Sequence, residues 1–355
     1  LFGVLMLPLL YAFLKNLFGK TPVAFCGTAL FAFDFMHLTQ TRIATIDTYG
    51  VFFILAMYYF MYRYLTLPAG APFRKGAPWL FLSGLFWGIG AASKWTVIYG
   101  GVGLALLYFL GLWFKLRDWP KAEEGQPSPA ARNPWLIQTL AFSVLCFIVI
   151  PACIYTLSYW PYAAARGDAS LSNLIHEMWK NQEYMLTYHQ GVHDTHPYSS
   201  RWYQWIVDGR PILYYLDYTS VPGSKSAFAA FSNPVVCWGG LLAMASLIAH
   251  SIRRRCGKAL FIVVAYFSQL APWFFIGRTT FEYHYFPSIL FLCFAIAYVY
   301  NDLFEMGLPW MRRSVYAMTG TAVVLYAAFY PVLIGLMVPR WYTSNLLQWL
   351  PSWPI

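Results

Sequence analysis

Long apolar runs recur along this chain, and they constrain its fold more than any other feature. A bilayer crossing needs about twenty mostly apolar residues, and ten candidate segments of this kind occur, several of them short. They are residues 1–14, 22–38, 46–62, 78–92, 95–114, 135–157, 235–250, 259–276, 285–300 and 315–338. Charged residues make up only 11% of the chain, against about a quarter in a soluble domain. The sequence therefore predicts an all-α, polytopic membrane protein.

The basic residues indicate how the chain is oriented, because Lys and Arg concentrate in short cytoplasmic loops. With alternate connections assigned to one side, 15 of the 24 basic residues fall together with five carboxylates, so that side carries the whole net charge of +10. We expect that side to be cytoplasmic. The basic residues are scattered between apolar runs, which argues against a nucleic-acid partner.

Two connections are long. Residues 115–134 contain the stretch EEGQPSP and are typical of a flexible cytoplasmic linker. Residues 158–233 on the other side are too aromatic for a disordered linker, and we expect short helices that form an extracytoplasmic lid. The predicted organisation is a transmembrane half at 1–157, the lid at 158–233 and a second transmembrane half at 234–355. The fourth and fifth segments are separated only by Ser93 and Lys94, which fits a tight hairpin or one broken helix.

Ionisable residues beside hydrocarbon are costly and indicate function. They collect at three outer turns: Arg42 and Asp47 in QTRIATIDTYG, Lys94 in GAASKWT, and Arg278 and His284, with Glu282, in GRTTFEYHYFP. Cations from three turns suit a phosphate ester, because guanidinium groups hold phosphate oxygens by paired hydrogen bonds. The alternative is a structural ion pair between Arg42 and Asp47, with Lys94 and Arg278 reaching to lipid headgroups.

The lid contains a second set of candidates. His189, His193, Asp194 and His196 have ligand-like spacing for a divalent metal, but no HExxH motif is present and structural roles are favoured. Aromatic side chains in the lid could stack on sugar faces or anchor the chain at the membrane interface. They are Trp202, Tyr203, Trp205, Tyr214 and Tyr215.

Five sequence blocks in order resemble the bacterial branch of the protein O-mannosyltransferase family, the phospholipid-carrier-dependent glycosyltransferases of the GT-C class. The blocks are RIATIDTY, GIGAASKWT, HPYSSRWYQWIVDGRPILYY, FSNPVVCWGG and RTTFEYHYFP. The resemblance implies an enzyme that moves a sugar, with mannose expected, from a polyprenyl-phosphate carrier to a Ser or Thr hydroxyl of a protein. Transfer is expected with inversion on the extracytoplasmic side.

The resemblance also implies roles for individual residues. Arg42 matches the arginine associated with the donor phosphate and Asp47 its acidic partner, while Arg278 and His284 match the block near the donor site. Lys94 matches a family block without a fixed role. For the acceptor and lid we expect His196, Trp202 and Trp205. No cofactor is expected.

The sequence departs from the family pattern at its start. The family's acidic catalytic pair lies in the first outer loop, and the chain starts at what corresponds to the second span, so we expect the general base upstream of Leu1. A different class, a transporter or flippase for a lipid-linked or anionic substrate, would also need cations in membrane clefts. It should have polar groups near mid-membrane, whereas here they lie at one face. A non-catalytic scaffold is a third reading.

Overall fold

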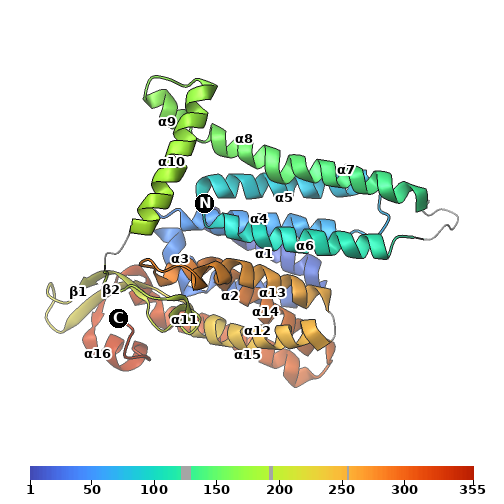
Figure 1. Cartoon of the computed structure of the whole chain (residues 1–355). Coiled ribbons are helices and arrows are strands. Elements are labelled where there is room, and N and C mark those ends of the chain that lie inside the picture. Colours follow the sequence, from blue (N-terminus) through green and yellow to red (C-terminus); the bar gives the residue numbers. More distant parts are fainter. Residues whose placement is uncertain (121–128, 192–194, 254–255) are drawn as a thin grey trace. The chain divides into compact units, whose positions relative to one another are not determined.

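The computed structural model describes residues 1–120, 129–191, 195–253 and 256–355. The chain forms two compact units, one made of Leu1–Thr48 with His193–Ile355 and the other of Tyr49–Val192. These units group residues by contact, so the first combines parts of all three predicted regions. Figure 1 shows the helices and strands of the two units with their labels.

The first unit is a helical bundle built around α14 (Phe286–Glu305), which contacts α1 (Phe2–Phe18), α2 (Thr21–Ala32), α12 (Pro234–Arg253), α13 (Gly257–Leu270) and α15 (Pro309–Ile334). Fourteen of the 20 residues of α14 are buried. A helix that is apolar on all sides is stable only when neighbours surround it, and Figure 1 shows α12, α13 and α15 running alongside it. This central helix begins directly after the turn that carries Arg278 and His284.

Short elements complete the first unit: α3 (Phe35–Arg42), α11 (Trp202–Trp205), α16 (Arg340–Tyr342), and the single turns η3 (Ala271–Phe274), η4 (Glu282–Tyr285) and η5 (Thr343–Leu347). Strands β1 (Ile212–Asp217), β2 (Ser224–Ala230) and β3 (Met337–Pro339) form an antiparallel sheet in the order β1-β2-β3. Asp217 starts the β1–β2 turn, since its side chain accepts hydrogen bonds from the backbone N–H groups of Thr219 (2.9 Å) and Ser220 (3.1 Å). The lid region therefore contains a hairpin as well as the expected short helices.

The described part of the second unit consists of helices: α4 (Asp47–Leu65, whose first two residues belong to the first unit), α5 (Phe73–Ser93), α6 (Val97–Arg117), η1 (Pro129–Ala131), α7 (Arg132–Val144), the π-helical turn η2 (Leu145–Val149), α8 (Ile150–Leu157), α9 (Trp160–Ala165) and α10 (Leu171–Gly191). In Figure 1, α7 and α8 follow one line. The segments left open as one broken helix or a hairpin are two helices, α5 and α6, that pack against each other.

Each of the ten predicted segments is mainly helical, although segment 315–338 runs past the end of α15 into β3, and among the described residues six helical stretches are long and apolar enough to cross a membrane. The pair α2 and α3, bent by 56°, would make a seventh span. The remaining predicted segments form α1, α4 and α5, of which α1 is a shorter apolar helix. The prediction of an all-α, polytopic membrane protein is confirmed, with one small sheet added.

Candidate active site

Arg42 is the last residue of α3, and the sequence positions it through a cap at the other end of that helix. The carboxylate of Asp34 accepts hydrogen bonds from the N–H groups of Met36 (2.9 Å) and His37 (3.3 Å), which satisfies backbone donors that begin the helix. The Arg42 side chain is exposed, and its guanidinium carbon lies 5.8 Å from the ring centre of Phe228. Arg42 is therefore free to meet a ligand above an aromatic ring.

Tyr214 of β1 lies beside the same ring. Its hydroxyl accepts a 2.7 Å hydrogen bond from Nε2 of Gln40, and its ring centre is 5.5 Å from that of Phe228. Burial raises the pKa of Tyr214 well above its usual value, so the hydroxyl keeps its proton. Because the hydrogen bond from Gln40 uses only an acceptor position, the Tyr214 proton can be donated to a ligand.

Tyr283 lies within electrostatic reach of two predicted site residues, Asp47 and Arg278. Asp47 and Arg278 both act electrostatically on Tyr283, and Asp47 acts on Tyr214 as well. Asp47 is buried where α4 begins, and Arg278 is half-buried in the turn before η4. Asp47 and Arg278 thus lie within electrostatic reach of Tyr283, and Arg42 is connected to Tyr214 through the ring of Phe228.

His284 lies in the same turn but is enclosed by aromatic rings. Its ring centre is 4.3 Å from that of Trp273, 4.4 Å from that of Tyr283 and 5.9 Å from that of Trp205. Its Nδ1 lies 2.9 Å from the carbonyl oxygen of Phe281. These contacts fix the imidazole of His284 beside Tyr283, the tyrosine on which Arg278 acts.

The lid segment is joined to the Arg278 turn by hydrogen bonds that involve the backbone. The Ser200 N–H donates to the Thr280 carbonyl (2.9 Å), and the Thr280 hydroxyl donates to the Ser200 carbonyl (2.6 Å). Nη1 of Arg201 donates to the carbonyls of Ile276 (3.2 Å) and Gly277 (3.0 Å). The position of the turn therefore depends on how the lid segment is held.

The three predicted acceptor and lid residues occupy different environments. His196 is exposed, and Trp202 is half-buried with its ring centre 4.1 Å from that of Phe274. Trp205 is wholly buried, and its Nε1 donates a 2.9 Å hydrogen bond to the Ser200 hydroxyl. Only His196 and Trp202 present surface to an acceptor, so Trp205 can contribute by supporting the segment.

Two predictions stay untested by these contacts. Lys94 directly follows α5 in the second unit, where its N–H donates a 2.9 Å hydrogen bond to the Gly90 carbonyl. Its role in binding a phosphate stays a prediction. The candidate metal ligands His193 and Asp194 lie outside the described residues. Within the described part of the chain, no group of three His, Cys, Asp or Glu side chains is arranged to hold a metal ion.

The roles of Gln40 and Phe228 were not predicted from the sequence. Gln40 donates a hydrogen bond to Tyr214, and the ring of Phe228 faces Arg42. Neither side chain is charged, so neither attracts notice in an apolar chain. Asp208 was also missed, although a carboxylate following an apolar turn in the lid was a usable signal. Asp208 is wholly buried.

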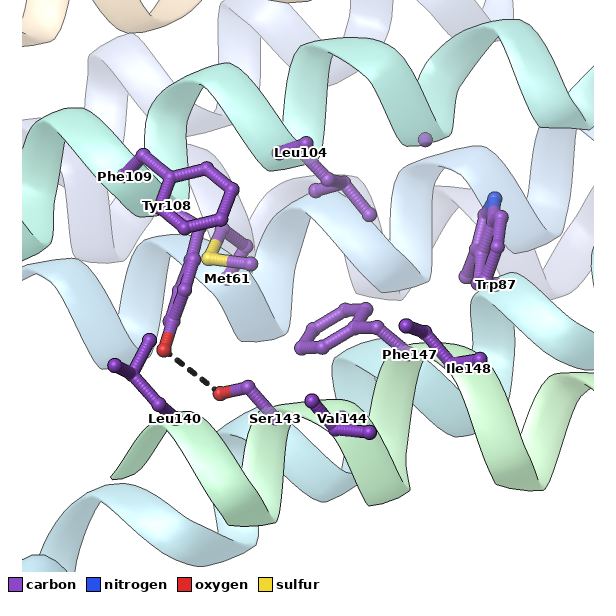
Figure 2. A pocket seen from close by; sticks show the side chains of 12 residues that line it. Met61, Trp87, Leu104, Tyr108, Phe109, Leu140, Ser143, Val144, Phe147 and Ile148 are labelled. Atoms are coloured by element: carbon purple, nitrogen blue, oxygen red, sulfur yellow. Dashed lines mark hydrogen bonds between the residues drawn. The ribbon is translucent and has the colours of Figure 1, made fainter. Parts of the chain in front are cut away.

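A cavity of about 320 Å³ lies in the second unit, lined mainly by α6, α7 and η2 with Met61 and Trp87. Figure 2 shows its apolar lining and the 2.8 Å hydrogen bond from the Ser143 hydroxyl to that of Tyr108. The cavity contains none of the predicted site residues and no charged side chain. Its chemistry suits hydrocarbon and does not suit a phosphate.

Two protein-family models together cover nearly the whole chain. The model described as the C-terminal four TMM region of protein-O-mannosyltransferase matches residues 174–353. The model of dolichyl-phosphate-mannose-protein mannosyltransferase matches residues 1–164.

Similar proteins and structures agree with these matches. The polyprenol-phosphate-mannose–protein mannosyltransferase of Mycobacterium tuberculosis is 25% identical over 99% of this chain and 75% of its own length. The enzyme of the same name from Corynebacterium glutamicum is 23% identical over 99% of this chain and 76% of its own length. The structure of the Saccharomyces cerevisiae protein O-mannosyltransferase Pmt1-Pmt2 complex bound to the sugar donor matches all of this chain and 80% of that chain, with a TM-score of 0.82 at 12% identity.

The helical fold, the membrane-spanning segments and these matches define the class: a multi-pass membrane glycosyltransferase of the GT-C type. Within that class, the chain belongs to the protein O-mannosyltransferase family.

Proposed function

We propose that this protein transfers a mannosyl group from a polyprenyl-phosphate carrier to a Ser or Thr hydroxyl of a protein, with inversion, on the extracytoplasmic side of the membrane. The names of the relatives support the donor and the acceptor. The charge asymmetry of the sequence supports the side, because the connections that carry the site are those without the excess of Lys and Arg.

The observation that supports the proposal is that Arg42 and Arg278 are each connected to one of two tyrosines, Tyr214 and Tyr283, that both feel the charge of Asp47. Arg42 lies over Phe228, which packs on Tyr214. Arg278 acts electrostatically on Tyr283, and the charge of Asp47 acts on both Tyr283 and Tyr214. Two guanidinium groups bind phosphate oxygens, and the tyrosine hydroxyls add neutral donors.

In the proposed reaction, the bond between the anomeric carbon and the phosphate oxygen breaks, and that oxygen leaves with the electron pair as polyprenyl phosphate. The acceptor oxygen forms the new bond from the opposite face, which inverts the anomeric centre. Arg42 and Arg278 neutralise the charge that develops on the leaving phosphate, and such preorganised donors act more strongly in a water-poor site than in bulk water. His196 and Trp202 contact the acceptor in this proposal.

The acceptor hydroxyl must also lose its proton to a base. Among the described carboxylates of the first unit, Asp34, Asp208 and Glu282 are wholly buried and Asp47 is nearly so. None of the four presents a surface to an acceptor, and the proposal assigns the role of base to none of them.

The test is transfer of radiolabelled mannose from polyprenyl-phosphate mannose to an acceptor protein, in membranes that contain the wild type or Arg42→Ala. Removing one donor that stabilises transition-state charge costs roughly 10²–10³ in rate, so that loss is the expected result. Arg313→Ala is the matched control, because Arg313 is an exposed arginine at the start of α15. Near wild-type transfer by Arg42→Ala, or transport of the lipid-linked sugar without transfer, would overturn the proposal.

A further inference from the structure

Two carboxyl groups are buried together beneath the lid segment. Asp208 and Glu282 are both wholly buried, and each acts on the other as a hydrogen-bonding neighbour. Within the described residues, Oδ2 of Asp208 and both carboxyl oxygens of Glu282 nevertheless have no partner with the geometry of a formed hydrogen bond. Placing two carboxylates side by side in a protein interior without donors is very costly.

A third acid nearby has the donors that the pair lacks. The Asp34 carboxylate accepts four hydrogen bonds, including 2.7 Å from the Ser232 hydroxyl and 2.9 Å from the Asn233 N–H. Among the described residues, Asp208 receives one from the Ser232 N–H at 3.0 Å and has the Cys237 thiol as a weak second donor, and Glu282 receives none. Asp34 is therefore equipped to carry a charge, and the pair is not.

In the described part of the chain, the titratable groups that act on the pair offer no compensating positive charge. Among the described residues that act on it or feel its charge are Asp34 of the α2–α3 bend, Cys237 of α12 and Tyr285 of η4. Tyr285 lies 2.7 Å from the hydroxyl of Tyr266 on α13. Burial raises the pKa of Asp208 above its usual range, and the charge of Asp34 adds to this increase. The pair is thus expected to retain one proton at neutral pH.

The pair also connects the two segments that shape the proposed site. Asp208 follows α11 and has a φ of 51°, the only positive φ of a non-glycine residue in the described part of the chain. Glu282 lies between Arg278 and His284 and directly precedes Tyr283. Strained backbone of this kind persists where surrounding contacts hold it, and the carboxyl pair is one such contact.

We propose that Asp208 and Glu282 are positioning residues: one proton shared between their carboxyl groups holds the lid segment against the turn that carries Arg278 and Tyr283, and loss of that proton separates them. The structural part of this inference stands on the buried pair alone. Its effect on catalysis rests on the proposed function, since it acts through Arg278 on donor binding.

The structural part is tested on the purified full chain in detergent, without an activity assay. Infrared spectroscopy of the wild type should reveal the C=O band of a protonated carboxylic acid at neutral pH, and the band should disappear at alkaline pH. The Asp208→Asn/Glu282→Gln variant should lack this band, whereas Glu183→Gln, an exposed glutamate of α10, should retain it. Absence of the band in the wild type would overturn the shared proton.

Hydrogen exchange of the Ser200 amide reports on the separation, because this N–H donates to Thr280 across the two segments. After correction for the intrinsic pH dependence of exchange, the wild type should lose protection as the infrared band disappears, by roughly tenfold for each pKa unit of coupling. The Asp208→Asn/Glu282→Gln variant should not lose protection. If both proteins keep the same protection at all pH values, the positioning role is excluded.

The catalytic part is tested by the pH profile of mannosyl transfer. In the wild type, the KM for the donor should rise at alkaline pH with the loss of Ser200 protection, and Asp208→Asn/Glu282→Gln should shift or remove that rise. A donor KM that follows the same alkaline profile in both proteins would overturn the link to the site. If no transfer is found at all, the proposed function fails. The infrared and exchange results still decide whether Asp208 and Glu282 share a proton that holds the two segments together.

Discussion

The carboxylate of Asp34 accepts a 2.7 Å hydrogen bond from the hydroxyl of Ser232, a residue 198 positions further along the chain. The same carboxylate caps α3, the helix that ends at Arg42. Ser232 lies just before α12 and also donates its N–H to Asp208. One buried acid therefore joins the helix that presents Arg42 to the entry of α12 and to the end of the lid segment.

Replacing this acid should destabilise the first unit. Asp34→Ala leaves buried donors of Ser232 and Asn233 without their acceptor, together with the N–H groups that Asp34 caps. Each unsatisfied buried group costs about 1–3 kcal/mol, so we expect a loss of roughly 3 kcal/mol or more, measured by unfolding in detergent. Asp217→Ala, at an exposed turn, is the control and should cost far less. Equal losses in the two variants would contradict the account.

Gly84 should tolerate no side chain. A Cβ built there would lie 2.2 Å from the carbonyl oxygen of Cys146, so α5 would have to move away from η2. We expect Gly84→Ala to destabilise the protein by more than about 2 kcal/mol, within the range for overpacked interiors. The matched substitution Gly320→Ala in α15 meets nothing within 4 Å and should be neutral or stabilising by up to about 1 kcal/mol. Similar melting temperatures for the two variants would exclude this close approach.

The stability contributed by Asp208 should fall as the pH rises. Burial raises its pKa from 3.8 to about 7, so the folded protein holds a proton that the unfolded chain has lost. That contribution is complete below about pH 4 and is lost as the pH approaches 7. The melting temperature of the wild type should therefore fall between about pH 5 and pH 8 by several degrees more than that of Asp208→Asn. A larger fall of the melting temperature for Asp208→Asn than for the wild type would contradict the raised pKa of Asp208.

The two tryptophans of α11 should respond differently to truncation. Trp205→Ala empties a wholly buried site and leaves the Ser200 hydroxyl without its donor, so we expect a loss of roughly 3–5 kcal/mol and reduced protein yield. Trp202→Ala removes a half-buried ring and should leave folding nearly intact while raising the KM for the acceptor. Unfolding in detergent and acceptor titration measure the two effects. Comparable destabilisation by both variants would count against the distinction.

Much of the fold follows from local sequence. Apolar runs located all ten helical segments, because length and hydropathy alone decide which stretches suit a bilayer. The bend between α2 and α3 and the β1–β2 hairpin were not predicted, since both depend on polar contacts such as those of Asp34 and Asp217 with nearby backbone.

The site was predictable only in part. Arg42, Asp47 and Arg278 stood out because charges are rare in an apolar chain, and their joint action on one phosphate stays a prediction. The burial of Trp205 could not be predicted, because an aromatic residue in a lid serves equally well as a binding surface or as core. The Asp208–Glu282 pair joins residues 74 positions apart and requires the tertiary fold to recognise it.

The central claim is that Arg42 and Arg278 bind the same phosphate, and a double-mutant cycle on donor binding tests it most directly. Binding of polyprenyl-phosphate mannose is measured for the wild type, Arg42→Ala, Arg278→Ala and the double variant, with Arg313→Ala as control. If both arginines hold one phosphoryl group, the losses should be non-additive, with a coupling energy of about 1 kcal/mol or more. Losses that add to within about 0.5 kcal/mol, or binding unaffected by either substitution, would contradict the account.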